Sequence, residues 1–362
     1  MHVSKTRISL LQFIIMINSI QVGIGAVSLP RILAEKSGTS SWIAIIFGGI
    51  LSTIGSVMIV KVREFAPFET FPSFFNSFFG MVLGKLFTLF FSLYYLALGY
   101  LVLIRTILYI KTYLLQQTGV TTLIILLLIP AFQLAIGDVR LLAKYVEFFF
   151  PFFIGTFSML LFTLKDSNIQ YILPVIKDGW LPIFKTIPLT FFSFLGIGSI
   201  YILYPYLEKK EKAISGVIIA NLLSTCMFLF ITLICFIVFS PDEILNIFDP
   251  VLVILNVLEF QYVERLDVVI IAFAIINIST TWIPFLWFGF QGVSEVFRVK
   301  RFLIMVLSIY ILFIIATCFY TPTFKNNDIS TKFLSNIELY MVIFLPIILW
   351  ICHKLKSKFL LR

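Results

Sequence analysis

Two short stretches with glycines one residue apart interrupt long apolar runs of the chain. They are "QVGIGAVSLP" (21–30) and "SFLGIGSIYILYP" (193–205). In a helix interior a glycine costs about 1 kcal/mol and a proline about 3 kcal/mol relative to alanine. A segment that leaves the helix frees backbone amides, which attract a carboxylate, and carbonyls, which accept an ammonium group. An amino acid carries both groups, so the two stretches predict a binding site for such a molecule.

The backbone of the two stretches supplies the first candidate ligands. Glycine is also common where membrane helices pack closely, and that is the alternative for either stretch taken alone. Two similar stretches at corresponding positions of the chain favour binding instead, because an unwound segment inside a membrane survives only where it lines a cavity or meets a ligand. The candidates are Gly23, Ile24, Gly25 and Ala26 in the first stretch and Gly196, Ile197, Gly198 and Ser199 in the second.

Polar side chains of two other apolar runs complete the candidate site. The run "SLYYLALGY" offers Tyr94 and Tyr95, with Tyr100 beyond them, although tyrosine is also frequent at membrane interfaces. The run "INISTTW" has four polar residues within five positions, which need partners in a dry interior. Such groups also bond helix to helix, at roughly 0.6 kcal/mol each, so both interpretations stay open. The four residues are Asn277, Ser279, Thr280 and Thr281.

Charged residues are scarce within the apolar runs. Arg105 lies toward the outer part of one run, where we expect its side chain to snorkel to the interface. Glu147 lies about one turn into another, and either a functional or a structural role fits it. We expect no carboxylate beside either glycine stretch. This absence favours a binding protein that changes state over an ion-coupled pump.

The composition places the chain in the membrane. Of the 362 residues 60% are hydrophobic and only 12% are charged, against roughly 25% charged in ordinary globular domains. The net charge of +9 fits basic cytoplasmic loops better than nucleic-acid binding. The four cysteines lie in apolar runs without metal-ligand spacing, and the two histidines stand at opposite ends of the chain. We therefore predict no catalytic residues, no metal site, no cofactor and no enzymatic activity.

Ten apolar runs are long enough to be membrane-crossing helices, which need about 20 residues each. The amino-terminal run is too long for a signal peptide, so we expect it to stay as the first helix. The sequence predicts an all-α polytopic membrane protein with spans near 8–30, 41–62, 83–115, 121–137, 146–164, 183–205, 213–239, 268–297, 302–321 and 337–353.

The distribution of charge orients these spans. With the amino terminus inside, most lysines and arginines fall on the inner side, as expected for cytoplasmic loops. The longest outer segment, about 240–266, is acidic and reads as a partly amphipathic loop or a short surface helix. We predict both termini in the cytoplasm and one membrane domain over residues 1–362.

The two glycine stretches also mark an internal repeat. "GIGAV" begins at Gly23 in the first span and "GIGSI" at Gly196 in the sixth. Five helices precede the second copy, so the second half crosses the membrane in the opposite sense. This predicts a five-plus-five inverted repeat with broken helices one and six, an architecture of many secondary transporters. The repeats cover about 8–164 and 183–353, with 240–266 as an insertion in the second.

Four stretches of the chain are distinctive. They are the opening "ISLLQFIIMINSIQVGIGAVSLPRILAEKSGTSSWIAIIFGGIL", "VEFFFPFF", "PLTFFSFLGIGSIYILYPYLEKKEKA" and "FWFGFQGVSEVF". In these stretches the chain resembles the spore germination permease family, the B-type subunits of nutrient germinant receptors, within the amino acid–polyamine–organocation superfamily. The resemblance implies a five-plus-five fold with a nutrient site beside spans one, three, six and eight. It also implies an A-type membrane subunit and a C-type lipoprotein as partners in the spore inner membrane.

Two functions remain from this reading. The first is a sensor. A small nutrient, which the argument above makes an amino acid, binds at the broken helices and shifts the equilibrium between two packings of the helix bundle. Partner subunits then respond to this change. The second is an amino acid transporter, a uniporter or symporter, that uses the same site. Fold alone does not decide between them.

Overall fold

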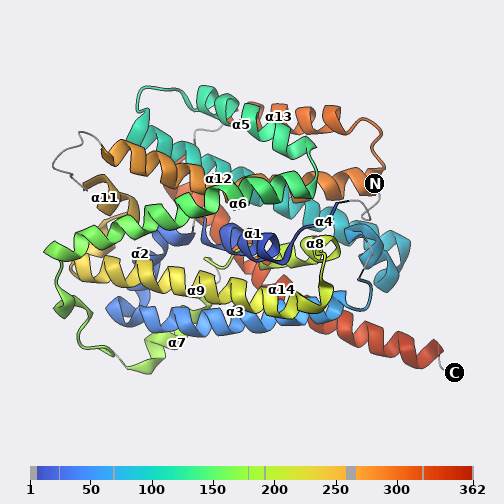
Figure 1. The fold of residues 1–362 in the computed structure, drawn as a ribbon, viewed down its shortest axis with the longest axis horizontal. Coiled ribbons are helices and arrows are strands. Elements are labelled where there is room, and N and C mark those ends of the chain that lie inside the picture. Colours follow the sequence, from blue (N-terminus) through green and yellow to red (C-terminus); the bar gives the residue numbers. More distant parts are fainter. Residues whose placement is uncertain are drawn as a thin grey trace.

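The computed structural model describes residues 6–23, 25–67, 70–177, 179–190, 193–257, 266–319 and 322–360. Within these ranges the chain is helical, and its β-type pairing is limited to one isolated bridge between Ile8 and Leu207. The predicted all-α fold is confirmed. The helices run roughly along the long axis of the molecule (Figure 1). They are α1 (Leu10–Val22), α2 (Gly25–Ser37), α3 (Trp42–Arg63), α4 (Phe71–Tyr109), α5 (Val120–Ile136), α6 (Val139–Ser158), α7 (Trp180–Thr190), α8 (Ile200–Leu203), α9 (Ala213–Val238), α10 (Glu243–Asn246), α11 (Pro250–Val257), α12 (Leu266–Phe297), α13 (Phe302–Phe319) and α14 (Phe324–Leu360).

Many of these helices are long and apolar enough to cross a bilayer. Within the described residues there are seven such segments, and α1 and α5 are shorter apolar helices. The chain is therefore a multi-pass membrane protein. The predicted count of ten spans and the division into two repeats stay predictions.

Both glycine stretches fall where helices end. α1 stops at Val22, Gly23 takes the non-helical angles φ −35° and ψ −91°, and α2 begins at Gly25. α7 stops at Thr190, and a short 3-10 turn over Ile197–Ser199 leads into α8. We call the segments between these helices the first and the second interruption.

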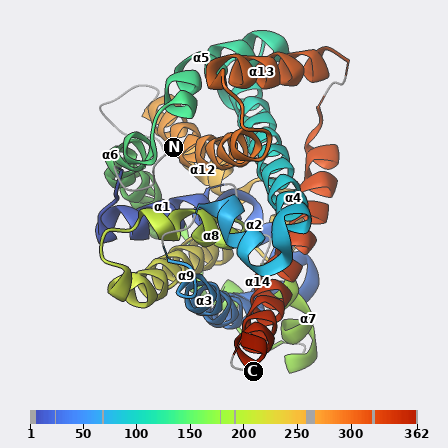
Figure 2. The ribbon, with the colours of Figure 1, turned by 90° about the vertical axis from the view of Figure 1, so that its right-hand side faces the viewer.

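Glycine and other small residues bring α4 and α12 close together along their length (Figure 2). A Cβ atom on Gly99 would lie 2.6 Å from the Leu286 side chain, and one on Gly292 would lie 2.0 Å from Ser92 Oγ. Membrane helices use small residues in this way because the apolar lipid offers no hydrophobic drive for association. Some glycines of this chain thus serve packing, as the alternative interpretation expects.

The chain turns back on itself near the start of α4. Gly80 has φ 79° and ψ 171°, which L side chains rarely adopt, and it separates residues 71–79 from the long remainder of the helix. A Cβ atom on Gly84 would lie 2.6 Å from the backbone of Asn76, so the two parts are in contact. Glycine is therefore required at the turn itself, at position 80, and at position 84 just after it.

The two ends of the bundle carry different contacts. At one end the Phe65 ring stacks on His353 near the end of α14, and Ile8 pairs with Leu207. At the other end Arg105 of α4 pairs with Asp328 in the first turns of α14. In Figure 1 the start of the described chain and the end of α14 lie on one side and α11 on the other.

The segment expected as an outer loop or surface helix contains α10 and α11. α11 packs against α2 and α12, and its Val251, Leu252 and Leu255 side chains are buried. α11 is therefore part of the packed structure rather than a helix on the surface. Residues 258–265 lie outside the described part of the chain.

Candidate functional site

The two interruptions are packed against each other. A Cβ atom on Gly25, the first residue of α2, would lie 2.7 Å from the Cα atom of Ser193 in the second interruption. A Cβ atom on Gly196 would lie 2.3 Å from Cγ2 of Ile20 in α1. Gly196 also has φ +102°, in the left-handed region that favours glycine. The glycines of both stretches are therefore needed for this close approach, and Ile24, between two of them, lies outside the described residues.

Thr281 of α12 covers the end of α1. Its hydroxyl donates a hydrogen bond of 2.9 Å to the carbonyl of Ser19, which lies in the last turn of α1. A Cβ atom on Gly23 would lie 1.8 Å from Thr281 Oγ1. The predicted site residues Gly23 and Thr281 are thus in direct contact.

An acidic side chain of α14 holds the second interruption. Glu338 Oε1 accepts hydrogen bonds from the amides of Gly196 at 2.8 Å and Gly198 at 3.0 Å. Its Oε2 accepts a hydrogen bond of 2.6 Å from the Tyr94 hydroxyl, and the side chain is buried. The amides of Gly196 and Gly198 are therefore bound by the protein's own carboxylate.

The expectation that no carboxylate lies beside either glycine stretch is wrong. The sequence reading began the last span near residue 337, which put Glu338 at its outer end. In the structure α14 begins at Phe324, more than three helical turns earlier, so Glu338 lies deep in the bundle. The polar segment around residues 325–332 hid this extension of the helix.

The tyrosines of α4 divide between the site and the lipid-facing packing. Tyr95 is buried, its ring packs on Phe285 with centroids 5.8 Å apart, and its hydroxyl lies 2.8 Å from the Cβ position of Gly198. Tyr94 binds Glu338 as described above. Tyr100 instead packs its ring against Phe313 of α13, 4.8 Å away between centroids. The structure therefore brings together two of the three tyrosines.

The polar run of α12 is split in the same way. Asn277 donates a 3.4 Å hydrogen bond to Thr156, and the Ser279 hydroxyl is 2.5 Å from that of Tyr145, so both face α6. Thr280 donates to the carbonyl of Asn277 within its own helix. Only Thr281 reaches an interruption, and for Asn277 and Ser279 the structure favours helix-to-helix bonding.

The remaining predicted backbone residues are deeply buried. Ala26, Ile197 and Ser199 are all 0% exposed. The hydroxyls of Ser199 and of the neighbouring Ser193 have no hydrogen-bond partner among the described residues. Unpartnered hydroxyls in a dry interior are costly, so this region has spare capacity to bind a polar ligand.

A buried polar network beside the first interruption was missed by the sequence reading. Asn18 and Gln21 of α1 bond to Ser224 and Asn221 of α9, at 2.9 and 3.2 Å. Asn221 also donates to Ser56 of α3 at 2.9 Å. The signal was present, because both pairs are three residues apart and each pair therefore shares one face of its helix. The network fixes α1 against its neighbours just before the helix ends.

Arg105 does not snorkel. Its guanidinium binds Asp249 at 3.1 Å, Asp328 at 2.7 Å and the Tyr109 hydroxyl at 2.8 Å, and it is 1% exposed. The sequence could not show this because Asp249 and Asp328 are far away along the chain. Burial raises the pKa of Asp249 above its ordinary value, while Arg105 and the hydrogen bond from Tyr109 act in the opposite direction. This ion network joins α4, the start of α11 and α14.

Glu147 has a structural partner. It accepts a hydrogen bond of 2.9 Å from the amide group of Gln12, which also closes the capping box at the start of α1 with Ser9. The contact joins α6 to α1 at the end of the bundle that carries the isolated bridge. Of the two roles left open for Glu147, this supports the structural one.

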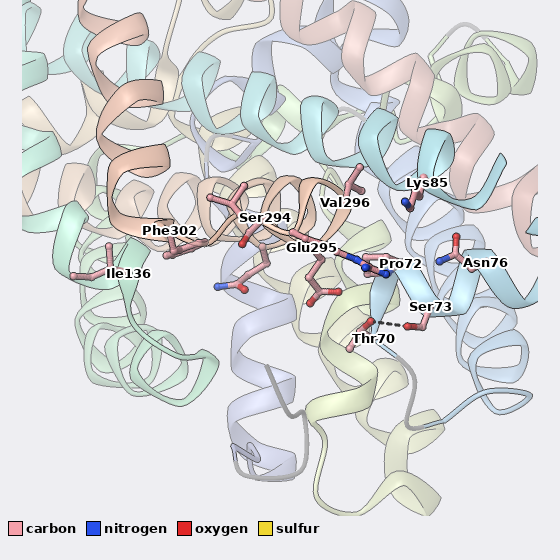
Figure 3. Close-up of a pocket in the computed structure, with 13 residues that line it drawn as sticks. Thr70, Pro72, Ser73, Asn76, Lys85, Ile136, Ser294, Glu295, Val296 and Phe302 are labelled. Atoms are coloured by element: carbon pink, nitrogen blue, oxygen red, sulfur yellow. Dashed lines mark hydrogen bonds between the residues drawn. The ribbon is translucent and has the colours of Figure 1, made fainter. Parts of the chain in front are cut away.

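A cavity of about 600 Å³ opens beside the start of α4 and the end of α12 (Figure 3). Thr70, Ser73, Lys85, Glu295 and Arg298 give it a polar wall of both charge signs. A second space of about 10 Å³ shares Pro72, Gln291 and Glu295 with it and reaches Ile202 of α8, Tyr206 and Phe288. The lining of this second space therefore extends from the cavity to α8, which follows the second interruption along the chain.

The fold is shared with two solved structures. The structure resembles MhsT, solved in complex with L-phenylalanine, with a TM-score of 0.65, 14% identity and coverage of 93% of this chain and 88% of that one. It also resembles a Na+-coupled sialic acid symporter, with a TM-score of 0.58, 11% identity and coverage of 94% and 75%. At these identities the likeness shows the fold alone.

The sequence identifies the family. The family model described as "Spore germination protein" matches residues 7–325, so the chain belongs to this family, the spore permeases. The spore germination protein YndE of Bacillus subtilis (strain 168) is 25% identical over 358 residues, 98% of each chain. GerQB of Bacillus cereus is 23% identical over 352 residues, 95% of this chain and 94% of its own. The predicted resemblance to the spore germination permease family is confirmed.

Proposed function

We propose that this chain is the germinant-sensing subunit of a spore nutrient receptor, and that it binds a small nutrient, an amino acid, at the two interruptions. The observation that carries the proposal is the meeting of the interruptions, where Gly25 contacts Ser193 and Gly196 contacts Ile20. Thr281, Tyr94, Tyr95 and Glu338 surround this meeting point from three other helices. Two comparisons support this proposal. The relatives are named spore germination proteins, and MhsT, which has a similar fold, was solved in complex with L-phenylalanine.

Signalling in this proposal is a shift between two packings of the bundle. A ligand moves such an equilibrium only by binding one packing more tightly than the other. The interruptions suit this role because their backbone groups are held by side chains from α12 and α14, which a ligand must rearrange. An A-type membrane subunit and a C-type lipoprotein read the change in the spore inner membrane, with both termini of this chain cytoplasmic.

The decisive experiment is nutrient-triggered germination of spores from a strain that lacks this gene. The panel contains amino acids, sugars and nucleosides. We expect the loss of the response to one class of amino acid, and its return when the gene is restored. Unchanged germination with reduced nutrient uptake by growing cells would contradict the receptor and support a transporter.

An amino acid transporter is the second candidate because of the cavity beside the end of α12. The smaller space that shares part of its lining reaches Ile202 of α8. In this alternative function it would widen into a route between the second interruption and one end of the bundle. Alternating access requires such a route on each side of the membrane in turn. Uptake of radiolabelled amino acids into proteoliposomes that contain this chain alone would favour this function over a pure sensor.

A further inference from the structure

Glu338 carries a buried carboxylate that is held by neutral donors. Two backbone amides and one tyrosine hydroxyl bind it, and it is 2% exposed. The ion pairs among the described residues are Arg31–Glu35, Arg105–Asp249 and Arg105–Asp328, and none of them includes Glu338. An ionisable side chain deep in a membrane bundle marks a functional site with a partner to be named. The partner that this environment lacks is a positive charge.

A second oxygen lies close to the same carboxylate. The hydroxyl of Tyr95 is buried and has no hydrogen-bond partner among the described residues. It lies 2.8 Å from the point where a Cβ atom of Gly198 would stand, and Glu338 Oε1 lies 3.7 Å from that point. An anionic oxygen and an unpartnered neutral oxygen therefore both lie close to Gly198.

We propose that Glu338 and Tyr95 together bind a monovalent cationic group beside Gly198. The proposal deepens the function given above and rests on it, because it names the charge that the nutrient site recognises. The ammonium group of an amino acid and a free sodium ion share the required chemistry. The carboxylate supplies the counter-charge, and the Tyr95 hydroxyl supplies a lone pair.

The arrangement disfavours an anionic group at this position. The amides of Gly196 and Gly198, which would attract the carboxylate of a ligand, already bind Glu338. A second carboxylate beside the first would be repelled in a medium of low dielectric constant. The second interruption is therefore a site for the positive end of a zwitterion.

The test uses spores that carry the complete receptor, with the Glu338→Gln variant and a matched control. Glutamine keeps the shape and can still accept from both glycine amides, while it removes the charge. Glu147→Gln is the control, because it neutralises another partly buried glutamate that is held by Gln12. Tyr95→Phe is a second variant that removes only a hydroxyl without a partner, so it keeps the proposal testable if Glu338→Gln does not fold.

The expected result is a response to amino acids that their N-acetyl derivatives fail to produce. Glu338→Gln raises the half-maximal nutrient concentration by about tenfold or more, as for loss of a charge-assisted contact, and Glu147→Gln leaves it within about twofold. Replacing sodium by N-methyl-D-glucamine in the germination medium distinguishes the two possible cations, the ammonium group of the nutrient and a free sodium ion. If the cation is the nutrient's ammonium, the Glu338→Gln effect is independent of sodium. If the cation is sodium, removing sodium weakens the nutrient response of the wild type and does not change the response of Glu338→Gln.

A sodium-independent response to a sugar or nucleoside that Glu338→Gln leaves unchanged would overturn the proposal and leave the receptor function intact. If deleting the gene alters no nutrient response, the receptor function fails instead. The cation site is then tested directly on the purified protein in detergent. Sodium chloride or methylammonium chloride should raise the unfolding temperature of the wild type and not of Glu338→Gln, with choline chloride as the ionic-strength control. Equal effects on both proteins would overturn the site.

Discussion

Glu338 Oε1 lies 2.8 Å from the amide nitrogen of Gly196, so a side chain of α14 occupies backbone donors freed where the α7–α8 segment leaves the helix. At the α1–α2 segment the contact has the opposite sense, because Thr281 donates a hydrogen bond to the Ser19 carbonyl in the last turn of α1. The two interruptions are therefore chemically distinct although both contain a Gly-Ile-Gly stretch. A ligand that binds between them competes with, or adds to, contacts from α12 and α14.

The first prediction concerns the contact between the two interruptions. Gly25→Val should abolish nutrient-triggered germination while the protein remains inserted in the membrane. The Cβ atom would stand 2.7 Å from the Cα atom of Ser193, and no side-chain rotation relieves a clash with backbone. The measurement is germination of complemented spores, with membrane content followed by immunoblot.

The matched control for Gly25→Val is Gly155→Val. Gly155 lies in α6, and a Cβ atom there would meet nothing within 4 Å. It should germinate at the wild-type nutrient threshold. A Gly25→Val variant that also responds at the wild-type threshold would show that the ligand does not bind at this contact.

The second prediction separates backbone strain from close contact. Gly196→Ala puts a side chain at φ +102° and also within 2.3 Å of Ile20. Gly179→Ala puts one at φ +78° with nothing within 4 Å, so it suffers from strain alone. Strain of this kind costs about 1–2 kcal/mol, and overpacking adds about 1–3 kcal/mol. Thermal unfolding in detergent should therefore show a clearly larger loss for Gly196→Ala, and equal losses would remove the argument for close approach.

Sequence reasoning located the interruptions because they depend on local backbone chemistry. Glycines and a proline in an apolar run are visible without any knowledge of neighbours. The same holds for Thr281 and Tyr94, which were found as polar residues in otherwise apolar spans. These features can be read one helix at a time, so the fold class and much of the site were accessible from the sequence.

The partners of buried charges were not accessible in this way. Arg105 meets Asp249 and Asp328, which are separated from it by 144 and 223 positions, and only tertiary packing brings them together. Glu338 was assigned to a helix end because the polar residues at the start of α14 disguise a continuous helix. The sequence also does not show which of the four polar residues of α12 faces the first interruption. The rotation of α12 about its own axis is set by the helices that pack against it. Long-range pairing and helix rotation are therefore what the sequence left open.

The third prediction concerns the ion network of Arg105. Arg105→Met leaves the carboxylates of Asp249 and Asp328 without their shared cation. Breaking a buried pair typically costs about 3–5 kcal/mol, whereas an exposed pair contributes about 0–1 kcal/mol. Arg31→Met is the control, because its partner Glu35 is 37% exposed. We expect a large fall in unfolding temperature for Arg105→Met and a small one for Arg31→Met, and comparable falls would show that the network is not buried in solution.

The fourth prediction is a dependence of stability on pH that comes from Asp249. Burial raises the pKa of this carboxyl above its ordinary value of 3.8, against the opposing effect of Arg105. An acid whose pKa is raised by folding stabilises the protein most below its unfolded-state pKa, and this contribution is lost as the pH rises through the folded-state pKa. Relative to Asp249→Asn, the wild type should therefore lose stability as the pH rises from 3.8. Unfolding temperatures of both proteins between about pH 3 and 7 give the difference. A wild type that instead gains stability over the variant would show that the attraction of Arg105 outweighs burial.

The last prediction tests the orientation and the cavity together, by thiol labelling in a background without the accessible cysteines. Ser294 lines the cavity of about 600 Å³, at the end of α12 that precedes the basic segment 298–301. Glu243, in α10 near the opposite end of the bundle, is exposed. If the basic end of the bundle faces the cytoplasm, Ser294→Cys should react with a membrane-impermeant maleimide in inside-out vesicles. Glu243→Cys should react with the same reagent in right-side-out vesicles. The opposite pattern would reverse the proposed orientation of the chain. Labelling of both cysteines from the same side would contradict their placement at opposite ends of the bundle.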